Sequence, residues 1–259
     1  MGRVIAFSNQ KGGVGKTTTC VNMAACLAGF GKKVLVIDLD PQGNATTGLG
    51  INKGSVKNAV YQVLTAETSI KDATLETGIE NLYILPSSID LAGAEVELVY
   101  LKNREKRLCE AVKKASKQYD YIMIDCPPSL GLLTINALTC ADSIIIPIQC
   151  EFYALEGLSQ LMHTFKLVIK HLNPKLDIAG VSLTMYDGRA IASRQIAEEI
   201  RKFFGEKVFK TVIPRNIRVS EAPSHDMPVI KYDPKCTGTR AYTELTKEFL
   251  SMEEENVGK

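Results

Sequence analysis

The chain has 259 residues, of which 45% are hydrophobic and 23% charged, and its formal net charge is +2. These values are ordinary for one sizeable globular domain rather than two small ones. No apolar stretch is long enough to cross a bilayer, and we find no signal-peptide pattern at the N-terminus. The seven cysteines never form C-x-x-C and lie mostly in apolar runs, which indicates buried, reduced thiols in a cytoplasmic protein rather than zinc ligands or disulfides.

A phosphate-binding loop is predicted over residues 8–18, between an expected strand at 4–7 and an expected helix at 19–28. Glycines let consecutive backbone N–H groups curl around an anion, and the new helix directs its positive dipole end there. Lys16 would reach the β- and γ-phosphates of a nucleotide, and the Thr17 hydroxyl would complete a Mg²⁺ shell. The alternative is a glycine-rich turn with two solvated lysines. The predicted nucleotide-binding residues are Gly12, Gly13, Val14, Gly15, Lys16, Thr17 and Thr18.

Two aspartates, Asp38 and Asp40, follow the next expected strand, residues 33–38. In open α/β sheets ligands bind beyond the carboxyl ends of the strands, so these acids should arrive beside the phosphates. A carboxylate there can position a water for in-line attack on the γ-phosphate, or hold Mg²⁺ through a water. The competing interpretation is a pair of turn-forming aspartates before a proline.

The middle of the chain carries a second acidic signal. The apolar run 119–125 ends in Asp125, and Pro127 and Pro128 then force an extended exit. An apolar strand ending in Asp downstream of a phosphate loop has the form of a Walker B element, whose carboxylate fixes Mg²⁺ through a water. Standing alone, it would be only a strand ending at a helix-capping Asp.

The other expected elements alternate between strands and helices. Further strands are expected at 82–86, 143–148, 178–184 and 208–213, and helices at 55–64, 90–118, 154–172, 193–204 and 237–250; residues 65–78 should form a surface excursion. This alternation predicts one α/β domain over 1–259, a mostly parallel twisted sheet with helices on both faces. The acidic tail, 251–259, is expected to fray.

The C-terminal third holds two weaker signals. Residues 187–240 contain eleven Lys and Arg against seven Asp and Glu, which favours a polyanion partner but also suits a solvated face. Pro214 and Asn216 follow the last expected strand at the binding edge. Asn can present a donor and an acceptor to an adenine edge and Pro can pack on the ring, although a plain turn is the simpler interpretation.

The loop Lys11-Gly-Gly-Val-Gly-Lys-Thr resembles the deviant Walker A loop of the ParA/MinD family of P-loop ATPases. The stretches 38–43, 125–129 and 214–223 extend the resemblance along the chain. It implies a slow, partner-stimulated ATP hydrolase that uses ATP/ADP and Mg²⁺. The resemblance also implies that Lys11 reaches across a dimer interface to the partner's nucleotide. Asp40 would support hydrolysis, with a second potential role at Mg²⁺ through water. Pro214 and Asn216 would line the base.

The resemblance is greatest to the small chromosome-partitioning (ParA/Soj) branch of the family. It implies an ATP sandwich homodimer that binds non-specific double-stranded DNA in the ATP state, a ParB-type centromere-binding partner, no membrane, and a nucleoid-associated place in a bacterial cytoplasm. Arg189 and Arg218 match the family's basic positions and are the predicted DNA contacts. The rivals are a MinD-like positioning ATPase without DNA binding, a nitrogenase-iron-protein-like reductase using Cys126 and Cys150, and a biosynthetic or capsule-type regulator.

Overall fold

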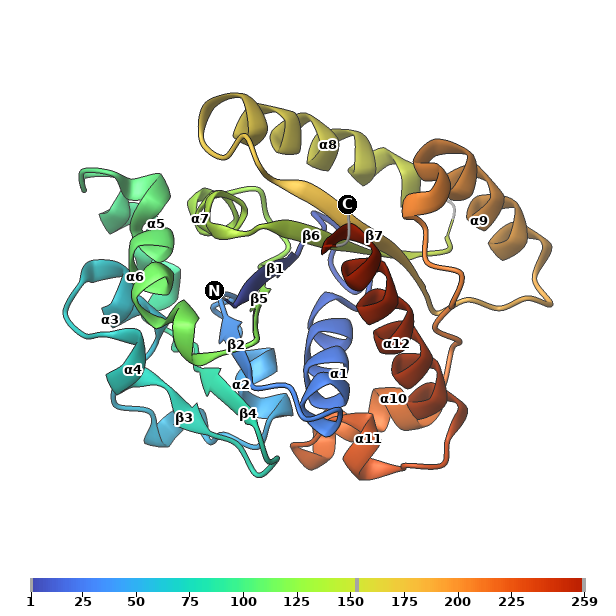
Figure 1. Ribbon diagram of the computed structural model, residues 1–259, viewed down its shortest axis with the longest axis horizontal. Helices are drawn as coiled ribbons and strands as arrows, with labels where there is room; N and C mark the ends of the chain where they lie inside the picture. Colours follow the sequence, from blue (N-terminus) through green and yellow to red (C-terminus); the bar gives the residue numbers. More distant parts are fainter. Residues whose placement is uncertain (1, 152–153, 258–259) are drawn as a thin grey trace.

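The protein is described by a computed structural model covering residues 2–151 and 154–257 (Figure 1). Over these residues the chain forms one seven-stranded sheet of order β3-β4-β2-β5-β1-β6-β7. The strands are β1 (Arg3–Phe7), β2 (Val34–Asp38), β3 (Leu75–Glu76), β4 (Leu82–Leu85), β5 (Tyr121–Asp125), β6 (Ser143–Gln149) and β7 (Asp177–Thr184). The neighbouring strands pair in parallel, except that β3 runs antiparallel to β4. The predicted mostly parallel sheet is confirmed.

Helices cover both faces of this sheet (Figure 1). They are α1 (Lys16–Gly29), α2 (Asn44–Gly48), α3 (Val60–Thr65), α4 (Ile70–Ala73), α5 (Leu91–Leu98), α6 (Arg107–Ala115), α7 (Leu132–Cys140), α8 (Ala154–His171), α9 (Ile191–Phe204), α10 (Ile217–Glu221), α11 (Val229–Tyr232) and α12 (Thr237–Val257). Short 3-10 turns occupy Lys53–Ser55, Arg104–Lys106, Ser116–Gln118, Gly205–Lys207 and Ala222–His225. None of the helices in this described part is long and apolar enough to span a membrane.

The two faces are separated by the alternation of side chains along each strand. In β1, Val4 and Ala6 join one buried cluster, while Ile5 and Phe7 join the other. Residues of α3, α5, α6, α7 and α9 belong to the first cluster, and residues of α1 and α12 to the second. A strand buried on both faces needs a continuous apolar run. The apolar runs of β1, β2, β5 and β6 therefore allowed these strands to be predicted from the sequence.

The register of the central strands sets the position of the loops that follow them. Phe7 of β1 and Asp38 of β2 both pair with Asp125 of β5, so these three strands end at the same level. The segments after them therefore meet at one edge of the sheet.

The helix expected at 90–118 is wrong as one element, because it is interrupted between α5 and α6. Asn103 adopts a left-handed conformation with φ 55°. Asn136 of α7 then caps the restart: its Nδ2 donates to the carbonyl of Arg104 at 2.7 Å and its Oδ1 accepts from the amide of Leu108 at 3.1 Å. A distant side chain thus satisfies the backbone groups that an unbroken helix would have paired internally.

The strand expected at 208–213 is also not a ladder strand. Phe209 and Ile213 donate their amides to β7, but the amides of Lys210 and Thr211 both donate to the Glu248 carboxylate of α12, at 2.6 and 2.9 Å. Glu248 therefore draws the middle of the segment away from β7, and only isolated bridges remain, one of them at Val208.

Smaller differences concern the ends of elements. The helix expected at 55–64 begins at Val60, because the Gln62 side chain accepts the Ala59 amide at 2.9 Å and caps it there. The excursion at 65–78 contains α4 and β3. In the acidic tail, α12 continues to Val257, and Glu253 forms a 2.9 Å ion pair with Arg3. Residues 258–259 lie outside the described part.

Candidate nucleotide site at the carboxyl edge of the sheet

The loop at 8–18 is held open by two glycines in left-handed conformation. Gly13 has φ 74° and Gly15 φ 85°, values that L side chains rarely adopt. Gly15 immediately precedes α1, whose first amides are free to donate to a ligand. The Asn9 side chain anchors the loop to β6 by donating to the carbonyl of Pro147 at 2.7 Å. Thr184, at the end of β7, donates to the carbonyl of Val14 at 2.8 Å. The loop is thus a preformed anion cradle.

Lys16 folds back into this cradle. Its side chain is only 6% exposed, and Nζ donates to the carbonyl of Lys11 at 3.0 Å. Burial lowers the pKa of Lys16, while the carboxyl groups of Asp125 and Asp40 oppose that shift. The lysine therefore lies beside the acids and inside the loop, as the sequence indicated.

Asp125 is fully buried, and neither carboxylate oxygen has a well-formed hydrogen bond to any residue that the structure describes. Burial, together with the nearby charge of Asp38, holds the pKa of Asp125 well above its usual range, and Thr17 and Lys16 act in the opposite direction. Buried polar atoms are rarely left without partners. A pair of unpaired carboxylate oxygens beside a threonine hydroxyl suits a hydrated divalent cation held through water.

Asp38 and Asp40 have different surroundings. Asp38 Oδ2 accepts from both the amide and the hydroxyl of Thr46 at 2.7 Å, and burial raises the pKa of Asp38 to about 6. Asp40 is 7% exposed, accepts the Gln42 amide at 2.9 Å and lines the open space beside the loop. Asp38 is therefore engaged in holding α2, and Asp40 is the one of the two acids that lines the cavity.

A cavity of about 590 Å³ opens where these groups meet. Its lining residues are Gly12, Gly13, Gly15, Lys16, Thr17, Thr18, Val21, Asp40, Gln42, Asn44, Thr47, Gly48, Lys53, Pro128, Met185 and Pro223. Six of the seven predicted loop residues are therefore brought together with Asp40. Val14 is 1% exposed, and only its carbonyl is engaged, by Thr184.

No group of three or more His, Cys, Asp or Glu in the described residues could hold a metal unaided. That is compatible with Mg²⁺, which usually takes one or two carboxylates, waters and substrate phosphates.

Met185 and Pro223 line the cavity although sequence reasoning did not single them out. Met185 directly follows the end of β7, so the rule that drew attention to Asp38 and Asp125 could have found it. Pro223 comes from the segment after α10, at the end of the stretch 214–223 that carries part of the family resemblance, but no role was predicted for it.

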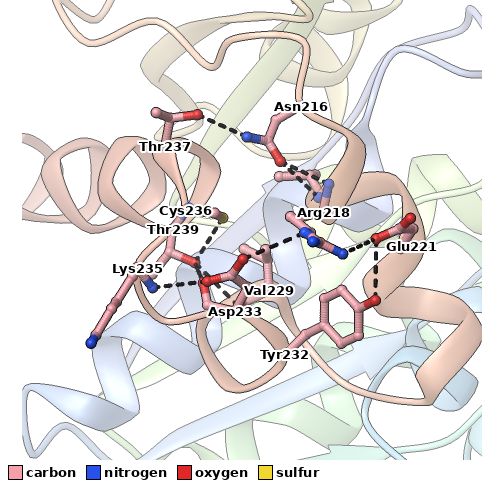
Figure 2. A network of polar contacts seen from close by, with 11 residues as sticks. Asn216, Arg218, Glu221, Val229, Tyr232, Asp233, Lys235, Cys236, Thr237 and Thr239 are labelled. Carbon is pink, nitrogen blue, oxygen red and sulfur yellow. Dashed lines mark hydrogen bonds and ion pairs between the residues drawn. The ribbon is translucent and has the colours of Figure 1, made fainter.

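Pro214 and Asn216, the residues predicted for the base, are not among the described lining residues. Pro214 bridges to Tyr186, the residue after Met185. Asn216 caps α10: its Oδ1 accepts the amides of Arg218 and Val219 at 2.8 and 3.3 Å, and its Nδ2 donates to the Thr237 hydroxyl at 2.8 Å (Figure 2). The Asn216 side chain is thus occupied within the fold, and its contact with a base stays a prediction.

Lys11 lies outside this cavity lining. Its Nζ is 3.9 Å from a carboxylate oxygen of Glu151, whose other oxygen is 3.7 Å from Arg215. The lysine is about one-third exposed, so it can exchange this contact for another at small cost.

The two predicted DNA-contact arginines are both paired with carboxylates. Arg189, 93% exposed, binds both oxygens of Asp187, with Nε–Oδ1 at 3.0 Å. Arg218 lies 2.9 Å from Glu221 and 3.5 Å from Asp233, and Figure 2 shows its guanidinium between the two. Exposed pairs of this kind contribute little stability, so both arginines remain able to bind an external anion.

The segments that carry these arginines adjoin each other. The Arg215 amide donates to the carbonyl of Tyr186 at 3.4 Å, which joins the segment before Arg189 to the segment before Arg218. Arg215 is itself 70% exposed and adds a third cation that sequence reasoning passed over.

Comparison with known proteins places this geometry in a family. A family model described as an AAA domain matches residues 2–178. The chain is 58% identical over 248 residues to the sporulation initiation inhibitor protein Soj of Bacillus subtilis, covering 96% of this chain and 98% of that protein. It is 50% identical over 259 residues to the chromosome partitioning protein ParA of Caulobacter vibrioides, covering 99% and 97%.

Solved structures share the fold. Cobyrinic acid a,c-diamide synthase from Mycobacterium smegmatis, with bound ADP and magnesium, superposes with a TM-score of 0.87 at 37% identity and covers 99% of this chain and 97% of that one. The cell division ATPase MinD from Pyrococcus furiosus superposes with a TM-score of 0.80 at 28% identity, covering 97% and 100%.

Proposed function

Because the chain belongs to the family of ParA and Soj chromosome-partitioning ATPases, we propose that it binds and slowly hydrolyses Mg-ATP in the 590 Å³ cavity. We propose further that its ATP-bound form is a DNA-binding dimer. The observation that carries the proposal is the buried Asp125, whose oxygens have no well-formed hydrogen bond to any described residue although they lie near Lys16, Thr17 and the glycine loop.

Binding follows from the loop geometry. The amides of the glycine loop and of the first turn of α1 donate to the β- and γ-phosphates, and Lys16 exchanges its bond with the Lys11 carbonyl for a phosphate oxygen. Thr17 would hold Mg²⁺ directly, and Asp125 and Asp40 would hold it through water. When bound, Mg²⁺ neutralises charge on the transferred phosphoryl group.

Hydrolysis needs a positioned water. Asp40 is fixed by the Gln42 amide and faces the cavity, so its carboxylate can orient a water for in-line attack. Lys11 points to Glu151 instead of the cavity, so one chain by itself lacks this second positive charge at the phosphates. A partner chain would place its own Lys11 at the phosphates and so supply this second positive charge. ATP turnover would therefore be slow until a dimer forms and a partner protein rearranges that dimer.

Binding to DNA would follow from pairing two cationic surfaces. Arg189, Arg215 and Arg218 lie on adjoining segments, and they would contact phosphates without reading bases. Each surface binds weakly alone, and a dimer would present two at once, so that avidity makes DNA binding depend on nucleotide. A ParB-type centromere-binding protein would then stimulate hydrolysis and release the dimer from the nucleoid of a bacterial cell.

The test is binding to non-specific duplex DNA with ATP, with ADP and without nucleotide, at two salt concentrations. We expect ATP-dependent binding that weakens steeply with salt. Lys16→Ala, which removes the phosphate-binding cation, should bind no ATP and therefore no DNA. Equal binding in all nucleotide states would contradict the switch, and binding to anionic liposomes instead of DNA would favour the MinD-like alternative.

A further inference from the structure

A second cavity lies at the opposite edge of the sheet from the nucleotide site. Its volume is about 630 Å³, and its lining includes the start of β1 and the residue before β6. These are the amino ends of the strands, whereas the nucleotide cavity lies beyond their carboxyl ends. Two cysteines line it, Cys109 of α6 and Cys140 at the end of α7.

We propose that Cys109 and Cys140 are a redox-active dithiol, in which a peroxide oxidises Cys109 and Cys140 then closes a reversible disulfide between α6 and α7. Helices α6 and α7 pack against each other, and each supplies one of the two half-buried thiols to the same cavity. No nucleotide-site residue is involved.

The surroundings of Cys109 favour its thiolate. The neighbouring Cys140 thiol favours the charged form of Cys109, and the positive charges of Lys113 and Lys106 add to this effect; together they lower the pKa of Cys109 to about 6, against burial and Glu110. The same interaction between the two thiols raises the pKa of Cys140, aided by burial and Asp142 and opposed by Lys113. The pair therefore comprises one thiolate nucleophile and one protonated thiol that faces it.

The remaining charged groups around the cavity are mostly cationic. Arg3 of β1 and Lys175 before β7 line it alongside Lys106 and Lys113, against the single lining carboxylate of Asp142 among the described residues. Asp142 accepts the Val4 amide at 2.8 Å and so is held by the backbone. A cavity of this charge and size admits hydrogen peroxide or a small thiol reductant.

The chemistry balances without any group from the nucleotide site. The Cys109 thiolate attacks one peroxide oxygen; the S–O bond forms, the O–O bond breaks, and the leaving hydroxide takes a proton to become water. The Cys140 thiol then attacks the sulfenic sulfur; the S–S bond forms and hydroxide leaves with the Cys140 proton as a second water. Peroxide is reduced by two electrons and the dithiol is oxidised by two. A thiol reductant reverses the reaction.

The first experiment is peroxide treatment of the whole chain, followed by alkylation of free thiols and peptide mass spectrometry. We expect two of the seven thiols to become unreactive and a Cys109–Cys140 linked peptide to appear and to vanish with dithiothreitol. Cys140→Ser keeps a hydroxyl beside Cys109 and should leave a sulfenic acid that dimedone traps. Cys236→Ser, at the third half-buried cysteine, is the matched control and should still form the disulfide.

The second experiment separates a reactive pair from two merely adjacent thiols. In the wild-type chain the alkylation rate of Cys109 should be half-maximal near pH 6, whereas an unperturbed thiol rises until about pH 9. A half-maximal rate near pH 8.5, or dimedone capture in the wild type without any linked peptide, would overturn the proposal. Both readouts are independent of ATP turnover.

Discussion

Asp38 and Asp40 show how two residues of one type, two positions apart on the same segment, can have different surroundings. Thr46 donates two hydrogen bonds to Oδ2 of Asp38, whereas Asp40 accepts the Gln42 amide and lines the cavity. From their positions in the sequence alone, the two acids at the end of the strand were equivalent. Only the family resemblance assigned the role in hydrolysis to Asp40. The placement of both side chains agrees with that choice, although the catalytic role itself stays a proposal.

Replacing Asp40 with alanine should separate binding from hydrolysis. We expect Asp40→Ala to bind ATP and to accumulate on DNA, because the loop is intact. Its rate of phosphate release should fall at least about 100-fold, because the water-positioning carboxylate is lost. Phosphate release and nucleotide affinity are measured side by side. Asp72→Ala, which removes an exposed carboxylate on α4, is the control and should turn over normally. Normal turnover of Asp40→Ala would remove Asp40 from catalysis.

At the scale of single elements, long-range contacts decided what the sequence could not. The apolar runs of β1, β2, β5 and β6 are local signals and were predicted. The break between α5 and α6 depends on Asn136, which is distant along the chain, and the loss of a ladder at 208–213 depends on Glu248 of α12. Neither partner can be identified from the segment that it alters.

The candidate site shows the same division. The glycine loop and Asp125 were predicted because each signal is contained in one short stretch, and parallel topology brings their ends together. Pro223 enters the cavity from a segment more than two hundred residues after the loop. Asn216 was predicted for a base, but its amide caps α10 and binds Thr237, an engagement that only the tertiary structure reveals.

Substitution of Gly180 would test how closely β7 packs against the 208–213 segment. A Cβ at Gly180 would lie 2.3 Å from the Phe209 ring, which is 1% exposed and cannot withdraw. We expect Gly180→Ala to lower the free energy of unfolding by about 1–3 kcal/mol, the usual cost of overpacking. Gly29→Ala in α1, where nothing lies within 4 Å, should be neutral or slightly stabilising. Thermal unfolding of the two variants compares them, and equal midpoints would contradict the predicted clash.

Asn216 can be tested as a cap and as a base contact in one pair of variants. Asn216→Ala should lower the free energy of unfolding by about 0.5–2 kcal/mol through loss of the α10 cap. Thr237→Val keeps the cap and loses only the Asn216–Thr237 bond, so it should cost less. ATP affinity is measured for both. A large loss of affinity in Asn216→Ala at unchanged stability would show that its main role is at the base.

At the scale of the whole molecule, Lys11 should control assembly rather than binding. Since Lys11 lies outside the described cavity lining, Lys11→Ala should keep ATP affinity and lose the ATP-dependent dimer. Sedimentation with a non-hydrolysable ATP analogue gives the dimer dissociation constant. Lys117→Ala, an exposed lysine on another surface, is the control. A dimer of unchanged strength in Lys11→Ala would contradict the role of Lys11 across the interface.

The cationic surface should act on DNA of any sequence. Arg218→Ala is expected to weaken binding equally for all duplexes and to reduce the slope of log affinity against log salt by about 1 per lost phosphate contact, with dimerisation unchanged. Lys247→Ala removes a cation with a similar partner, Glu244 at 2.8 Å, from α12 and should leave DNA binding intact. If Arg218→Ala prevents the dimer from forming, Arg218 is structural instead.

Glu151 lies between the residue proposed for the dimer interface and the surface proposed for DNA binding. One oxygen faces Lys11, the residue proposed to serve the partner's nucleotide, and the other faces Arg215, beside the proposed DNA surface. If Lys11 leaves for a partner chain, Glu151 would keep Arg215 and the Gln149 side-chain amide among its described contacts, so a change at one surface would be felt at the other. Thermodynamic linkage is reciprocal: whatever factor ATP adds to DNA affinity, DNA adds to the affinity of the chain for ATP and for its partner copy. The chromosome would then help to assemble the very dimer that it captures.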